Sequence, residues 1–119
     1  MEVNLLKKYP LTKRDTVKRN KFKTKAVVRI ARKFGREFFD GDRKYGYGGH
    51  YYKKKFWYRV CKDIISFYKL SNKSSILDVG CSKGFMLYEF KKILPKIKVI
   101  GIDVSRYAIK NSKKEIKKF

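Results

Sequence analysis

A turn with a glycine at each end is the part of this sequence best suited to bind a small molecule. It lies in "SILDVGCSKGF", where Gly80 and Gly84 enclose the three residues "CSK". The first glycine lets the chain leave a strand sharply, and the second lets a helix begin close to a ligand. Ligands of α/β proteins bind where such a turn leads from a strand into a helix. The spacing therefore predicts a binding site here.

Two carboxylates accompany this turn. Asp78 lies two residues before Gly80, and Asp103 lies 23 residues after it, at the end of the next predicted strand. A carboxylate at the end of the second strand can accept hydrogen bonds from both hydroxyls of a ribose. A carboxylate beside the turn suits a cationic ligand rather than a pyrophosphate. We therefore expect a ligand that has a ribose and a positive charge.

Two common nucleotide-binding motifs fit the turn poorly. The dinucleotide fingerprint reads G-x-G-x-x-G, whereas this chain reads G-C-S-K-G-F, with Ser82 and Phe85 in place of the second and third glycines. A phosphate-binding P-loop is also excluded, because no G-K-[ST] follows. What remains is the pattern D-x-G-x-x-x-G.

The stretches "ILDVGCSKGFMLYEF" and "VIGIDVSRYAI" resemble the first two cofactor-binding motifs of class I S-adenosylmethionine-dependent methyltransferases. The first motif of that family usually has a glycine where this chain has Ser82. The resemblance implies S-adenosylmethionine as the cofactor. It places Asp78 at the ammonium group, directly or through water, Asp103 at the ribose and Val104 beside the adenine. It places along the methionine part Gly80, Cys81, Ser82 and Gly84.

A loop rich in tyrosine and glycine, "DGDRKYGYGGHYY", precedes these motifs. Together with the residues before it, the loop resembles the N-terminal region of a bacterial subgroup of the same family. The resemblance implies a lid over the cofactor or substrate, and its candidate rings are Tyr45, Tyr47, Tyr51 and Tyr52. No catalytic residue is assigned. His50 is expected to be a loop residue and Cys81 a packed small residue. Because the sulfonium cofactor itself supplies the electrophile, no catalytic acid or base is required.

The elements that position these residues follow from periodicity. Apolar residues at helical spacing predict one helix from Thr16 to Phe39 and a second from about Lys55 to Tyr68. The second helix is expected to bury one face that includes Val60, Ile64, Ile65 and Tyr68, with Trp57 and Cys61. Beyond it we predict a strand over 75–79, a helix over 84–94, a strand over 97–103, and a helix capped by Ser105 and running toward Lys118.

Alternating strands and helices of this kind predict an α/β fold with a parallel sheet. We expect the start of a Rossmann-like, doubly wound sheet of the class I methyltransferase kind, truncated after the second strand. Residues 1–54 form an N-terminal helical segment with the lid loop, and residues 55–119 form a partial cofactor-binding domain. Since that fold has seven strands in the family, we expect an N-terminal fragment, inactive alone, that associates with a missing C-terminal half.

The net charge of +23 raises a different hypothesis, a basic module that binds nucleic acid or another acidic partner without catalysis. The stretch "YYKKKFWYR" interleaves rings with lysines, as stacking and phosphate contact require. However, 25 lysines outnumber 8 arginines and are spread along the chain, which an AT-rich genome also produces. A nucleic-acid acceptor is compatible with the charge but not required by it, so the acceptor stays unassigned.

Cys61 and Cys81 fit no disulfide or zinc pattern, and no metal site is expected. No apolar run approaches the roughly 18–20 residues that span a bilayer, and the N-terminus has no apolar core typical of a signal peptide. These features predict a cytoplasmic protein with two reduced thiols.

Overall fold

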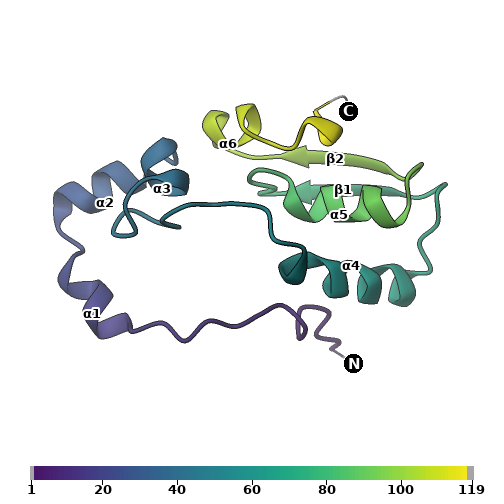
Figure 1. The fold of residues 1–119 in the computed structure, drawn as a ribbon, viewed down its shortest axis with the longest axis horizontal. Coiled ribbons are helices and arrows are strands. Elements are labelled where there is room, and N and C mark those ends of the chain that lie inside the picture. The colour runs from purple at the N-terminus through teal and green to yellow at the C-terminus, as the bar shows by residue number, and fades with distance from the viewer. Residues whose placement is uncertain (1, 118–119) are drawn as a thin grey trace.

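A computed structural model describes residues 2–117, and its centre is a parallel pair of strands (Figure 1). Strands β1 (Ser75–Val79) and β2 (Lys98–Ile102) are joined by helix α5 (Phe85–Ile93). In their register Leu77 lies opposite Ile100, and Asp78 lies opposite Gly101. The predicted strand–helix–strand unit with parallel strands is confirmed. Because both strands run the same way, their carboxyl ends lie at one edge of the sheet.

The predicted continuous helix from Thr16 to Phe39 is wrong. The segment forms three short helices, α1 (Thr16–Lys21), α2 (Lys25–Ala31) and α3 (Arg36–Asp40). Thr24 ends the first helical stretch because its side chain accepts a hydrogen bond from the Val27 amide and so starts a new helix. Phe34 interrupts the helical backbone a second time, because its φ of 47° is left-handed. In Figure 1 these helices form the end of the molecule opposite α4.

Helix α4 (Lys54–Tyr68) lies where the second helix was predicted. Val60 and Cys61 are fully buried, and Trp57, Ile64 and Ile65 pack beside them. Tyr68, however, is 61% exposed, so its assignment to the buried face was wrong. The helix ends there because Lys69 adopts the left-handed conformation of a C-cap.

The hydrophobic core lies between α4, α5 and one face of the sheet. Its buried residues outside α4 come from the turn, α5, the loop after α5 and β2: Cys81, Leu87, Phe90, Ile97 and Val99. Alternate residues of a strand point to opposite faces, so Ile76 and Val99 meet this core while their neighbours point away. The core therefore fixes the strand ends that carry the predicted site.

The opposite face of the sheet is apolar and open. Leu77, Val79, Ile100 and Ile102 are 50–72% exposed, and no helix within residues 2–117 covers them. Parallel sheets are otherwise covered on both faces. A sheet covered on one face is compatible with the beginning of a doubly wound fold.

The last predicted helix is shorter than expected. Helix α6 (Arg106–Lys110) begins as predicted, because the Ser105 hydroxyl accepts a hydrogen bond from the Ala108 amide at 3.0 Å. It stops at Asn111, and a short 3-10 helix, η1 (Lys114–Ile116), follows. The predicted endpoint Lys118 lies outside the described residues. Across residues 2–117, each helix is too short or too polar to cross a bilayer.

Candidate functional site

The turn between β1 and α5 has the backbone that its glycines predicted. Gly80 has a φ of 83° and Gly84 a φ of 71°, both in the left-handed region that glycine adopts readily. Ser82 also has a positive φ, 53°, which costs a residue with a Cβ roughly 1–2 kcal/mol. The departure from glycine at this position is therefore accommodated in the same backbone shape with some strain.

Asp103 connects the ends of the two strands. One carboxylate oxygen, Oδ2, accepts a hydrogen bond from the Ser82 amide at 2.7 Å, and Oδ1 accepts one from the Ser105 amide at 2.7 Å. A carboxylate has about four acceptor positions, so each oxygen retains capacity for a further donor. Asp103 thus holds the turn against the start of α6 and can still accept hydrogen bonds from a ligand.

Asp78 is half-buried near the end of β1, close enough to Asp103 for the two charges to interact. Burial raises the pKa of this carboxyl, and the negative charge of Asp103 raises it further. Within residues 2–117 no side-chain hydrogen bond to Asp78 is formed. A cationic ligand group placed here would offset both effects, because an opposite charge favours the ionised carboxylate.

The two thiols are free and buried. Burial, with a smaller contribution from Asp78, raises the pKa of Cys81 to about 11 and that of Cys61 to about 12. Thiols of this kind stay protonated at neutral pH and are poor nucleophiles.

In the described part of the chain, no three His, Cys, Asp or Glu side chains are grouped so as to hold a metal ion. Val104 is 84% exposed beside Asp103.

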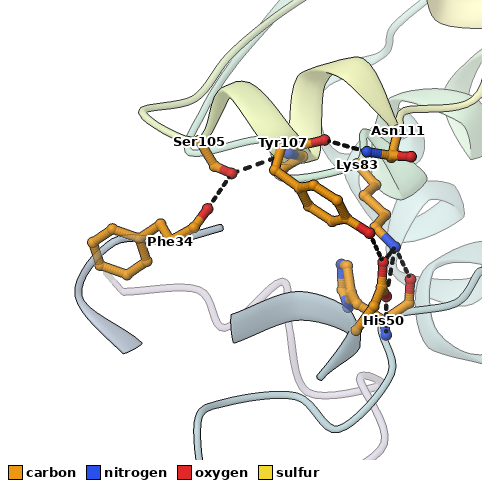
Figure 2. A network of polar contacts seen from close by, with 8 residues as sticks. Phe34, His50, Lys83, Ser105, Tyr107 and Asn111 are labelled. Carbon is orange, nitrogen blue, oxygen red and sulfur yellow. Dashed lines mark hydrogen bonds and ion pairs between the residues drawn. The ribbon is translucent and has the colours of Figure 1, made fainter. Parts of the chain in front are cut away.

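Lys83, in the middle of the turn, is buried in a network that sequence reasoning missed (Figure 2). Its Nζ lies 2.7 Å from both carboxylate oxygens of Asp40 and donates to the His50 carbonyl at 2.9 Å. Asp40 also accepts hydrogen bonds from the Tyr107 hydroxyl at 2.6 Å and the His50 amide at 3.1 Å. The network fastens α3 and the lid loop (residues 41–53) to the turn and to α6.

The hydrogen bonds of this network shift the pKa values of Asp40 and Tyr107. Burial alone would raise the pKa of Asp40, but the hydrogen bonds from Lys83, Tyr107 and the His50 amide outweigh it, so the pKa is lowered. The hydrogen bond to Asp40 raises the pKa of Tyr107, because that phenol is held as a donor. Asp40 is therefore ionised and Tyr107 neutral at physiological pH.

The four candidate lid tyrosines are not brought together. Tyr47 and Tyr51 face a cavity beside α4, while Tyr45 lines a different hollow near α2. Tyr52 packs against Phe85 and Tyr88 of α5. The loop approaches the turn instead through the His50 carbonyl, which Lys83 holds.

His50 is a partly buried loop residue whose ring lies 4.2 Å from that of Tyr47 and 4.8 Å from that of Phe85, between centroids. Burial, followed by the positive charge of Lys83, lowers its pKa from 6.5 to about 4. The unfolded chain then binds more protons than the folded protein between these values. Stability is therefore lost as the pH falls from 6.5 towards 4.

We expect His50→Phe, which keeps a ring but cannot be protonated, to flatten this dependence. Chemical unfolding at several pH values from 7 to 4 checks it. The quantity compared at each pH is the difference in the free energy of unfolding between variant and wild type, since other groups also titrate in this range. An unchanged slope in the variant would show that His50 is not held neutral.

Two aromatic residues of the basic stretch, Phe56 and Trp57, contact the N-terminal segment, whereas Tyr51 of the same stretch is 67% exposed. The Tyr9 ring lies 5.4 Å from Phe56 and 4.9 Å from Trp57, and Lys54 lies over the Tyr58 ring at 4.4 Å. The stretch serves here as an amphipathic helix start against the N-terminal segment.

These features form an α/β unit in which a strand runs into a glycine turn and a helix, with acids at both strand ends. Residues 70–119 match the family described as "Methyltransferase domain". The match confirms the resemblance to class I S-adenosylmethionine-dependent methyltransferases for this part of the chain, which contains the turn, Asp78 and Asp103. No curated protein and no solved structure gives a significant match.

Proposed function

We propose that this chain binds S-adenosylmethionine at the turn between β1 and α5 and serves methyl transfer to an acceptor. The observation that carries the proposal is that Asp78 and Asp103 lie at the carboxyl ends of two adjacent parallel strands, beside a turn whose two glycines are both left-handed. That arrangement suits a ligand with a positive charge and a ribose. The proposed contact residues are Asp78, Gly80, Cys81, Ser82, Gly84, Asp103 and Val104.

Each part of the site has a binding role in this proposal. Asp78 holds the ammonium group, and the free acceptor positions of Asp103 hold the ribose hydroxyls. The cofactor supplies a methyl group on a sulfonium. The acceptor's lone pair forms a bond to the methyl carbon, while the carbon–sulfur bond breaks and leaves its electron pair on sulfur. The protein's contribution is alignment and exclusion of water, in which residues 1–54 act as the lid segment.

We also propose that catalysis needs polypeptide on the open face of the sheet. Leu77, Val79, Ile100 and Ile102 are exposed there, and burying such a face stabilises the sheet by removing apolar area from water. The domain formed by residues 55–119 would then bind cofactor without completing an acceptor site by itself. Measurable methyl transfer by the isolated 119-residue chain would contradict this part of the proposal.

Asp103→Ala is the test of the cofactor site. We expect cofactor affinity to fall roughly 10- to 150-fold, as loss of hydrogen bonds to a charged group of about 1.5–3 kcal/mol implies. Calorimetric titration with S-adenosylmethionine measures it. Asp42→Ala is the matched control, since Asp42 is not among the proposed contact residues and, among the described residues, its carboxylate accepts a hydrogen bond only from the amide of Lys44, two residues on.

Because Asp103 also holds the turn, a second variant separates binding from folding. Asp78→Asn removes a charge without removing a hydrogen bond from another residue. It should weaken cofactor binding while leaving the unfolding curve near that of the wild type. Cofactor affinity that survives both changes would refute the assignment. Binding of a polyanion whose affinity falls steeply with added salt would instead indicate the polyanion-binding alternative.

A further inference from the structure

The cavity beside α4 that Tyr47 and Tyr51 line has a volume of about 350 Å³ and lies between the N-terminal segment, the lid loop and the start of α4. It reaches the lower end of the size range of small-molecule sites, which is about 300–1,000 Å³. Its lining combines rings and cations, and its principal members are Tyr9, Arg14, Arg43, His50, Trp57 and Phe85. None of these residues belongs to the proposed cofactor contacts.

The walls of this cavity are aromatic. Tyr9 and Trp57 form one tilted pair with centroids 4.9 Å apart, and His50 and Phe85 form another at 4.8 Å. His50 acts as an uncharged ring at neutral pH because its pKa is lowered to about 4. Rings arranged in this way bury a planar group by stacking and edge contacts.

The rim of the cavity is cationic. Arg14, Arg43 and Lys53 line it, and among its described lining residues there is no carboxylate. Among residues 2–117, the Arg43 guanidinium donates only to the Gly46 carbonyl of its own loop. Partial desolvation lowers the Arg43 pKa, and the nearby charges of Arg19 and Arg14 lower it further. Like charges held together favour an anion between them.

The nearest acids are occupied elsewhere. Asp15 caps α1 by accepting from the Lys18 amide at 2.9 Å, and Asp42 accepts from the Lys44 amide at 2.8 Å. Neither forms an ion pair with Arg14 or Arg43 within residues 2–117. The arginines are therefore left for a ligand, and arginine binds carboxylate and phosphate well because its fork can hold two oxygens at once.

The cavity adjoins the turn. Phe85, which lines it, directly follows Gly84, and the carbonyl of His50 accepts a hydrogen bond from Lys83 of the turn at 2.9 Å. A molecule in the cavity thus lies beside the element that would hold the cofactor.

We propose that this cavity binds a small molecule with a planar ring and an acidic group, and that this molecule is the methyl acceptor. The second half of the statement rests on the proposed function, whereas the first half does not. The ring lies between Tyr9, Trp57 and the His50–Phe85 pair, and the acidic group lies between Arg14 and Arg43.

Trp57 makes the test direct, because it is the only tryptophan of the chain. Its fluorescence is followed on titration with 4-hydroxybenzoate and with uridine monophosphate, and with their uncharged counterparts 4-hydroxybenzamide and uridine. We expect the charged member of at least one pair to bind at least tenfold more tightly than its neutral counterpart. The pair that does so distinguishes a carboxylate from a phosphate, and calorimetry repeats the titration without relying on fluorescence.

The double variant Arg14→Gln/Arg43→Gln should remove the preference for the charged compound, with a loss of tenfold or more. Arg59→Gln, an exposed arginine on α4, is the matched control and should bind as the wild type does. Equal binding of charged and neutral compounds, no binding at millimolar concentration, or an unaffected double variant would overturn the proposal. Tight, salt-sensitive binding of single-stranded RNA with none of uridine monophosphate would also overturn it.

Cofactor titration of the same variants keeps the two proposals separate. We expect Arg14→Gln/Arg43→Gln to bind S-adenosylmethionine as the wild type does. If the cofactor binds and the aromatic acids do not, only the present inference fails. If the aromatic acids bind and the cofactor does not, the cavity is a ligand site but the proposed function fails.

Discussion

Replacing Lys83 with methionine is expected to destabilise the protein by about 3–5 kcal/mol, the usual effect of leaving one partner of a buried ion pair alone. The Lys83 side chain is 7% exposed, and its Nζ lies 2.7 Å from both oxygens of Asp40. Without the ammonium group, Asp40 keeps only its bonds from Tyr107 and the His50 amide. Urea unfolding at pH 7 measures the loss as a lower midpoint with an unchanged slope.

Two further variants show whether the unpaired charge is the cause. Lys83→Met combined with Asp40→Asn removes both charges and should recover part of the lost stability. Lys33→Met, which changes an exposed lysine, should alter stability by no more than about 0.5 kcal/mol. A Lys83→Met cost as small as that of Lys33→Met would show that the pair is not buried in solution.

The same pair has a pH signature. The pKa of Asp40 is lowered below its ordinary value of 3.8, so the folded state holds that proton less tightly than the unfolded state. The stability from this carboxylate is therefore complete above about pH 4 and is lost as the pH falls through the folded value. Asp40→Asn should remove this part of the acid sensitivity.

Replacing Glu89 with methionine is expected to stabilise the protein, by roughly 1–4 kcal/mol at pH 7, as when other buried ionic groups are exchanged for apolar ones. Glu89 is 0% exposed in α5, and in the described part of the chain neither carboxylate oxygen has a hydrogen-bond partner. The Lys92 ammonium, 3.8 Å from Oε1, belongs to a side chain that is 42% exposed, so it offsets little. Thermal and urea unfolding measure the gain.

The pH dependence of Glu89 has the opposite sign to that of Asp40. Burial raises the Glu89 pKa, although Lys92 partly lowers it, so the folded state holds the proton more tightly than the unfolded state. Its destabilising effect therefore grows as the pH rises above 4.5. Glu89→Met should gain more at pH 7 than at pH 4, whereas Glu89→Gln, which keeps buried polar atoms, should gain less. A loss of stability in the methionine variant would mean that the carboxylate has a partner in solution.

The elements around the turn were predictable because local sequence determines them. Gly80 and Gly84 take backbone angles that other residues avoid, and Ser105 caps α6 with its own side chain. The alternation of the strands follows from the spacing of their apolar residues. The end of the first short helix near Thr24 was not predicted, because the helical spacing of apolar residues continues through this position. The Thr24 side chain nevertheless accepts a hydrogen bond from the Val27 amide and starts a new helix.

The network around Lys83 could not be predicted in the same way. Asp40 lies 43 residues before Lys83 and 67 before Tyr107, and no spacing rule links residues at such separations. The placement of the lid tyrosines in different hollows could not be predicted for a similar reason. Tyr45 and Tyr47 are two residues apart, yet the turns of a glycine-rich loop place them in different hollows.

The same long separations affect how the chain is made. Ribosomes add about 5–20 residues per second, so Asp40 is synthesised roughly 2–9 seconds before Lys83, and Phe34 waits longer for Ser105, its partner 71 residues on. During that interval α2 and α3 have none of the contacts that fasten them to the turn and α6. We therefore expect nascent chains stalled before the second strand to be cut by protease within residues 16–53, and protection there to arise only after α6 has left the ribosome.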